Sequence, residues 1–138
     1  MKIVLDTNVL VSALLRPESL PDRVLDLVLA RQVTLVLDQR IFTEYRNVLF
    51  RPEFAFPRDH VSNLLEFVWQ SSERVQATPL PIRLPDPDDV MFIEVAVSAL
   101  ADAMVTGNRR HFPPAQCHGA RVLSPREWLE VWAGTHEA

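Results

Sequence analysis

Short apolar runs alternate along the chain with longer segments whose apolar residues recur every three or four positions. The runs predict buried strands, and the periodic segments predict helices that bury one face. Strands are expected at 3–5, 34–37, 73–77, 103–105 and 121–123. Helices are expected from residue 7 to the break at Arg16-Pro17, from Pro21 onward, at 39–50, 59–71 and 88–100, and from Pro125 onward.

This alternation indicates the fold class. Consecutive strand and helix units favour a parallel sheet that is covered by helices on both faces. We therefore expect an α/β fold with three layers, α/β/α, around a central parallel sheet of four to five strands. The 138 residues contain no internal repeat and no low-complexity linker, so the prediction is a single domain over 1–138.

Composition narrows the function without fixing it. The net charge of −4 argues against a generally basic nucleic-acid binder. Thirteen of the fourteen basic residues are nevertheless arginine, and the planar fork of arginine matches phosphate groups. A codon bias toward arginine explains the same preference equally well, so this feature leaves both explanations open.

The cysteine count and the hydropathy bear on the compartment. Cys117 is the only cysteine, so no internal disulfide can form and a reducing compartment fits. No apolar run approaches the roughly 20 residues that span a bilayer, and the first residues carry no signal-peptide pattern. We therefore expect a cytoplasmic protein without a membrane partner.

Several acids lie where strands end or helices begin. Asp6 directly follows the first strand, and ligands of open parallel sheets gather at the carboxyl ends of the strands. Glu44 falls at the border of the apolar stripe on the third helix. Asp86, Asp88 and Asp89 crowd at the end of a proline-rich loop, where like charges repel one another unless a cation is present.

Each of these residues also has a structural explanation. Asp6 and the acids of 86–89 are suitable for helix caps and first helical turns. Glu44 is equally typical of a solvated side chain. Asn108, after the fourth strand, offers a neutral oxygen to a metal or merely shapes a turn. Two further acids, for which structural roles are favoured over ligand roles, are Glu94 and Asp102.

Other chemistries find little support in the sequence. The four histidines and the single cysteine lack zinc-site spacing, and no phosphate-binding glycine loop or Gly-x-Ser-x-Gly elbow is present. An Asp-x-Asp phosphatase would need an acid where Asn8 stands, and a receiver domain would need a late lysine, whereas Lys2 is the only one. Ligands that are all oxygen atoms favour the hard cations Mg²⁺ or Mn²⁺.

Four motifs follow one another along nearly the whole chain. They are Val4-Leu5-Asp6-Thr7-Asn8-Val9, Phe42-Thr43-Glu44-Tyr45, Asp86-Pro87-Asp88-Asp89-Val90-Met91-Phe92-Ile93-Glu94-Val95-Ala96 and Ala101-Asp102-Ala103-Met104-Val105-Thr106-Gly107-Asn108. In this order they resemble the PIN-domain family of small metal-dependent ribonucleases, most closely its bacterial branch of toxins from toxin–antitoxin pairs. The resemblance implies a PIN-like fold and an endoribonuclease that hydrolyses RNA phosphodiester bonds with Mg²⁺ or Mn²⁺.

The resemblance also assigns the catalytic acids position by position. The matching residues are Asp6, Glu44, Asp89 and Asn108. The family has an acid at the fourth position, so Asn108 departs from the pattern and supplies coordination without charge. The first three are the implied metal ligands, and we expect them to converge in space. Two neighbouring acids that could compensate for the missing charge are Asp86 and Asp88.

The implied partners are RNA and protein. Arg109 and Arg110 directly follow the fourth motif and are candidates for contacts with RNA phosphates, with Arg46 and Arg51 as weaker candidates. The resemblance further implies a homodimer and a small antitoxin protein that inserts a segment near the acids. Loss of the fourth acid leaves an alternative open, a catalytically weak or inactive PIN-like module that binds RNA or a protein partner.

Overall fold

The computed structural model describes residues 1–136, which form one five-stranded sheet whose neighbouring strands all run parallel. The strand order is β3-β2-β1-β4-β5. The strands are β1 (Lys2–Leu5), β2 (Thr34–Leu37), β3 (Glu73–Arg74), β4 (Ala103–Val105) and β5 (Val122–Leu123). The prediction of a parallel sheet with four to five strands is confirmed.

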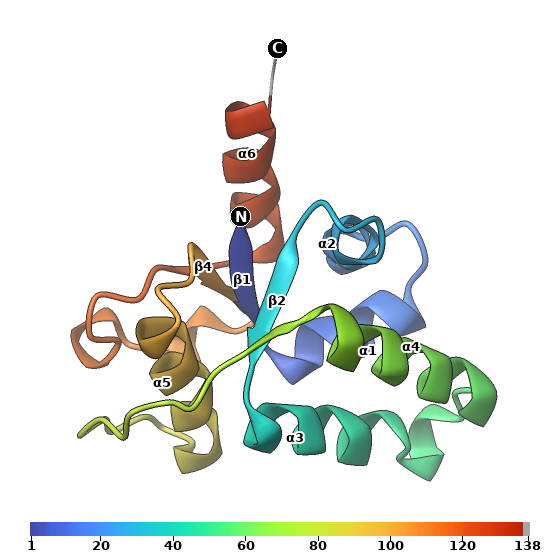
Figure 1. The fold of residues 1–138 in the computed structure, drawn as a ribbon, viewed down its shortest axis with the longest axis horizontal. Helices are drawn as coiled ribbons and strands as arrows, with labels where there is room; N and C mark the ends of the chain where they lie inside the picture. The colour runs from blue at the N-terminus through green and yellow to red at the C-terminus, as the bar shows by residue number, and fades with distance from the viewer. Residues whose placement is uncertain (137–138) are drawn as a thin grey trace.

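Helices flank the sheet on both sides. They are α1 (Thr7–Leu15), α2 (Leu20–Leu29), α3 (Gln39–Leu49), α4 (Arg58–Ser71), α5 (Val90–Ser98) and α6 (Pro125–His136). In Figure 1, α5 lies on one side of β1 and β2, and α1, α2 and α4 lie on the other. The expected three-layer α/β/α arrangement is therefore confirmed. Within residues 1–136, every helix is too short or too polar to cross a membrane.

The helix predicted over 88–100 is shorter than expected and begins differently. A 3₁₀ turn, Pro87–Asp89, precedes α5. Its cause is Asp86, whose side chain accepts from the N–H of Asp88 at 2.9 Å and whose carbonyl accepts from the N–H of Asp89 at 3.1 Å. At the other end, Leu100 takes the left-handed conformation, with φ of 52°, that commonly terminates a helix.

The third strand is also shorter than the predicted 73–77. Its partner β2 ends at Leu37, so the last hydrogen bond between them runs from the Val75 N–H to the Leu37 carbonyl at 3.1 Å. The proline-rich segment that follows lies along α5, where the Thr78 N–H donates to the Ser98 hydroxyl at 3.0 Å. The strand therefore ends because its partner ends, which no local pattern records.

The central strand determines where polar side chains can stand. Ile3, Val4 and Leu5 are 0% exposed because both faces of β1 are covered. Phe92 of α5 and Trp128 of α6 are also fully buried. Polar side chains next to the central strands can therefore stand only where the strands end. At the carboxyl end of β1, the first such side chain is Asp6.

Two hydrogen bonds fix the carboxyl end of β1. The Asp6 N–H donates to the Val105 carbonyl of β4 at 2.9 Å. The hydroxyl of Tyr45, which is fully buried on α3, donates to the Leu5 carbonyl at 2.5 Å. Tyr45 therefore ties the helix that carries Glu44 to the strand that precedes Asp6.

We predict that Tyr45→Phe destabilises the fold, because it removes the hydrogen bond to a buried carbonyl while keeping the ring. The expected loss is about 1–3 kcal/mol, the usual cost of an unpaired buried polar group. Urea denaturation followed by circular dichroism measures it. An unchanged unfolding midpoint would mean that the Leu5 carbonyl is satisfied without Tyr45.

Candidate functional site

Asp6 stands at the carboxyl end of the central strand with its carboxylate almost fully buried. It is 6% exposed and is the N-cap of α1, accepting from the Asn8 N–H at 3.5 Å. Its other oxygen accepts from the Thr106 hydroxyl at 2.7 Å. Burial raises the pKa of Asp6, and the hydrogen bond from Thr106 opposes that rise in part. Asp6 is therefore both a helix cap and a fixed, poorly solvated charge.

Glu44 lies on α3 and faces the start of α1. The Thr7 hydroxyl donates to one of its carboxylate oxygens, across 37 positions of sequence. Burial raises the pKa of Glu44, and the negative charge of Asp6 raises it further. The charges of Asp88 and Asp86 act in the same direction. The prediction that Glu44 lies at the edge of the core rather than in open solvent agrees with this half-buried position.

The acid turn, defined here as residues 86–89, contributes one half-buried carboxylate and two exposed ones. Asp86 and Asp88 are exposed, whereas Asp89 turns inward. The pKa of Asp89 is raised to about 6, mainly by burial and then by the charges of Asp6 and Asp86. Nδ1 of His111 lies 3.5 Å from an Asp89 carboxylate oxygen and favours its charged form.

Asn108 reaches the same region through His111. Its side-chain nitrogen lies 3.0 Å from Nε2 of His111, and its backbone N–H donates to the Thr106 hydroxyl at 3.0 Å. His111 thus links Asn108 to Asp89, a role that the search for zinc spacing had overlooked. Its place three residues after Asn108, on the same short turn, was the available signal.

The three acids that the sequence singles out influence one another electrostatically. The charge of Asp6 raises the pKa of both Glu44 and Asp89, and Glu44 also acts on Asp89. Within residues 1–136, however, no three His, Cys, Asp or Glu side chains stand close enough to hold one ion directly between them. Of the convergence expected from the sequence, the structure therefore shows an electrostatic influence among the three acids but no cluster of three direct metal ligands within residues 1–136.

A cavity of about 370 Å³ separates α3 from the acid turn. Its lining residues are Arg40, Glu44, Pro87, Asp88, Val90, Met91 and Glu94. A larger cavity of about 550 Å³ lies after β4 and has no carboxylate in its lining. Its lining residues are Arg109, Arg110, Phe112, Pro114, Cys117, Gly119, Ala120 and Val122. Of the candidate acids, Glu44 and Asp88 therefore border the smaller cavity, whereas Arg109 and Arg110 border the larger one.

Glu94 and Asp102 have the structural roles that the sequence analysis favoured for them. Glu94 is 6% exposed and pairs with Arg40 at 2.8 Å. Asp102 accepts from the Lys2 N–H at 2.8 Å, at the opposite end of β1 from Asp6. Glu94 lines the smaller cavity with Glu44 and Asp88 but is paired with Arg40, whereas Asp102 lies away from the acids at the carboxyl end of the sheet.

The candidate RNA-contacting arginines differ in their surroundings. Arg109 pairs with Glu127 of α6 at 3.1 Å and shares the larger cavity with Arg110. Arg46 is exposed and lies two residues after Glu44, roughly 200° around the helix, so it faces away from the acids. Arg51 is exposed in the loop after α3.

Comparison with known proteins gives one family and a common fold. A family model described as PIN domain matches residues 2–110. The structure is similar to that of VapBC2 from Rickettsia felis bound to a DNA fragment from their promoter, with TM-score 0.59, 15% identity, and 90% of this chain and 98% of that chain covered. It is also similar to PAE2754 from Pyrobaculum aerophilum, with TM-score 0.60, 18% identity, and 96% and 89% covered. A comparison with curated proteins finds no match.

We predict that Asp89→Asn stabilises the metal-free protein at neutral pH. The folded-state pKa of about 6 lies above the ordinary value of 3.8, so the folded state binds this proton more tightly than the unfolded state does. Asp89 therefore contributes stability below about pH 4 and loses it as the pH rises through about 6. Urea denaturation in a chelator should find the variant more stable than wild type at pH 7, with the difference shrinking toward pH 4. A variant less stable than wild type at pH 7 would assign Asp89 a structural role instead.

Proposed function

The chain belongs to the PIN domain family, and from this premise we propose that it is a metal-dependent endoribonuclease that hydrolyses RNA phosphodiester bonds. PIN domains are generally nucleases, and the observation that carries the proposal is the mutual effect of three carboxylates. Burial raises the pKa of Asp6, Glu44 and Asp89, and repulsion by the negative charge of Asp6 raises the pKa of Glu44 and Asp89 further. A divalent cation bound among them would relieve that repulsion.

The donor set fits Mg²⁺ or Mn²⁺. All three residues offer carboxylate oxygens, the ligands that hard cations prefer. Such an ion, when bound, activates water for attack on phosphorus and offsets the charge that develops on the phosphoryl oxygens. Asn108 adds a neutral oxygen, and the exposed acids Asp86 and Asp88 are further candidate ligands.

The surrounding side chains of this chain orient the carboxylates. The hydroxyl of Thr106 holds Asp6, and the hydroxyl of Thr7 holds Glu44. His111 stands beside both Asp89 and Asn108. Each acid thus has a hydrogen-bonding or ionic neighbour that limits its rotation, and this is the arrangement that a metal site needs to keep its ligands oriented.

RNA would approach from the side of Arg109 and Arg110. These residues follow Asn108 directly and line the larger cavity, so their guanidinium groups are suited to phosphates next to the one that is cleaved. Arg110 is the stronger candidate for a phosphate contact, because Arg109 is already paired with Glu127. Binding through these few arginines should weaken as salt rises, with a modest slope that is set by the small number of phosphates they contact.

We further propose that the protein is the toxin of a toxin–antitoxin pair, acts as a homodimer in the cytoplasm and is inhibited by a small antitoxin. The similarity in fold to VapBC2 from Rickettsia felis supports this proposal. Co-expression with the product of the adjacent reading frame tests it directly. A stable complex that suppresses RNA cleavage is expected, and free coexistence of the two proteins would contradict the assignment.

RNA cleavage in the presence of Mn²⁺ tests the proposed activity. Asp6→Asn and Asp89→Asn should each reduce the cleavage rate by more than about 100-fold, because loss of a direct ligand should cost more than the roughly 10–100-fold that loss of an outer-shell partner costs. Asp102→Asn is the matched control, since it also removes one carboxylate from the end of a central strand but at the opposite edge of the sheet. The control should cleave at the wild-type rate.

The outcome separates two functions. Wild type that cleaves RNA only when Mn²⁺ or Mg²⁺ is present supports the endoribonuclease. Wild type that binds RNA without cleaving it, at any concentration of either metal, contradicts the endoribonuclease and favours the PIN-like binding module. The observation that favours this second function is Asn108, a neutral residue where the family has an acid.

We predict that Asn108→Asp lowers the Mn²⁺ concentration for half-maximal cleavage. The substitution restores one negative charge at nearly unchanged size, and hard cations are held chiefly by carboxylates. The expected shift is about tenfold, equivalent to about 1.4 kcal/mol. A Mn²⁺ titration of cleavage rate measures it. Identical titration curves for variant and wild type would place Asn108 outside the coordination shell.

A further inference from the structure

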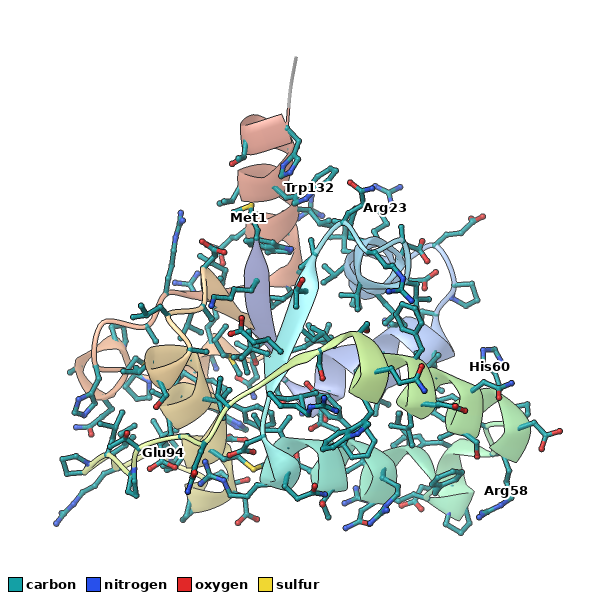
Figure 2. All side chains as sticks on the ribbon, viewed as in Figure 1. Met1, Arg23, Arg58, His60, Glu94 and Trp132 are labelled. Atoms are coloured by element: carbon teal, nitrogen blue, oxygen red, sulfur yellow. The ribbon has the colours of Figure 1, made fainter. Side chains whose placement is uncertain are left out.

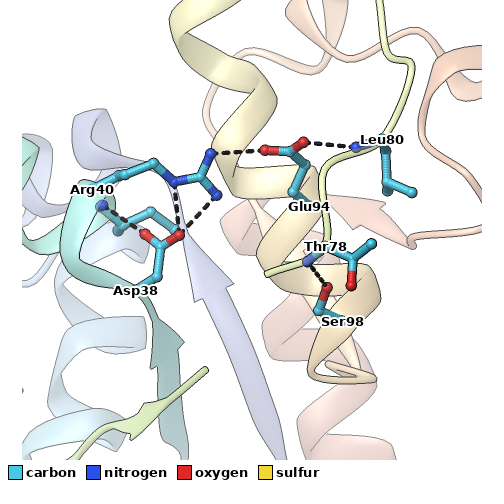
Figure 3. A network of polar contacts seen from close by, with 7 residues as sticks. Asp38, Arg40, Thr78, Leu80, Glu94 and Ser98 are labelled. Carbon is cyan, nitrogen blue, oxygen red and sulfur yellow. Dashed lines mark hydrogen bonds and ion pairs between the residues drawn. The ribbon is translucent and has the colours of Figure 1, made fainter. Parts of the chain in front are cut away.

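An ionic network joins the two helices that border the smaller cavity. In Figure 3 the guanidinium of Arg40, on α3, lies between the carboxylates of Asp38 and Glu94. Nη2 of Arg40 is 2.7 Å from an Asp38 oxygen, and Nε donates to the same oxygen at 2.8 Å. Nη1 donates to Glu94, on α5, at 2.8 Å. One cation thus connects the beginning of α3 with the middle of α5.

The two carboxylates of this network are nearly buried. The side chains of Asp38 and Glu94 are 11% and 7% exposed, whereas that of Arg40 is 49% exposed. Each carboxylate also accepts from a backbone N–H, Asp38 from Ile41 at 3.0 Å and Glu94 from Leu80 at 2.8 Å. Buried charges persist only when they are paired and hydrogen-bonded in this way. The network therefore fixes three segments: the start of α3, α5, and the extended segment over α5.

The same network lies beside the proposed ligands. Arg40 precedes Glu44 by four residues, so the two side chains lie on one face of α3. Both line the smaller cavity together with Asp88 and Glu94. Glu94 extends from the middle of α5, the helix that follows directly on the acid turn (Figure 2). The pair Arg40–Glu94 consequently joins the helix of Glu44 to α5, the helix that follows Asp89.

We propose that Arg40 is a positioning residue that holds α3 against α5, so that Glu44 and Asp89 stand at the separation needed to share a cation. This inference rests on the proposed metal-dependent function. Arg40 does not act on RNA directly, because two carboxylates already neutralise its charge and accept hydrogen bonds from two of its five N–H donors. It acts through the spacing of Glu44 and Asp89.

Metal affinity tests the proposal independently of cleavage. Mn²⁺ binding, followed by the electron paramagnetic resonance of free Mn²⁺, is compared in wild type, Arg40→Met, Glu94→Gln and the double variant. Each single variant should weaken Mn²⁺ binding about 10–100-fold, as loss of an outer-shell partner does. The double variant should be no weaker than the worse single variant, because both remove the same contact.

Two variants distinguish a specific loss of Mn²⁺ binding from a loss that is caused by unfolding. Glu94→Gln is isosteric and can still accept from the Leu80 N–H, so folding is retained. Lys2→Met is the matched control, because it breaks an ion pair of 3.0 Å with Glu73 that also joins two elements, β1 and β3, away from the acids. Lys2→Met should bind Mn²⁺ as wild type does, even if its unfolding midpoint falls as far as that of Arg40→Met.

The outcomes are distinct. Unchanged Mn²⁺ affinity in Arg40→Met and Glu94→Gln overturns the positioning role and leaves the proposed function intact. A reduced dependence of RNA affinity on salt in Arg40→Met overturns it as well, since that result would make Arg40 a phosphate contact. Wild type that neither binds Mn²⁺ nor cleaves RNA contradicts both proposals. Weakened Mn²⁺ binding with an unchanged salt dependence supports the positioning role.

Discussion

The buried carboxylate of Asp6 is the constraint around which the carboxyl end of the sheet is organised. β1 is covered on both faces, so the first polar side chain after it has little access to water. The protein satisfies that carboxylate with the Thr106 hydroxyl and the Asn8 N–H and leaves its pKa raised. Thr106 directly follows β4, and Asn8 lies in the first turn of α1. Both can donate to Asp6 only because β1 and β4 end, and α1 begins, at the same place.

Glu44 and Asp89 add further negative charge near the buried carboxylate of Asp6. Glu44 and Asp89 approach Asp6 closely enough that each experiences its charge, and burial raises the pKa of all three. The fold tolerates this because its hydrophobic core is large and because other acids, such as Asp38 and Glu94, are paired with Arg40. Within residues 1–136, Asp6 and Glu44 have no such ion-pair partner, and this contrast separates the candidate site from the structural ion pairs.

Much of the fold was predictable because its signals are local. Continuous apolar runs identified the strands, and their alternation with helices identified the parallel sheet and its three layers. The length of β3 was not predictable, because it depends on where β2 ends, and the 3₁₀ turn of Pro87–Asp89 depends on hydrogen bonds to Asp86. For the site, motifs pointed to Asp6, Glu44 and Asp89, whereas the contacts of His111 with Asp89 and of Arg40 with Glu94 join segments that lie far apart in the sequence.

A crystal structure with bound Mn²⁺ tests the central claim most directly, because Mn²⁺ is located by its anomalous scattering without any assumption about activity. We expect an anomalous peak at the carboxyl end of β1, bound by one or two of Asp6, Glu44 and Asp89 and connected to the remaining acid through water. A protein that takes up Mn²⁺ only at exposed acids far from Asp6, such as Asp59 at the start of α4, would contradict the account.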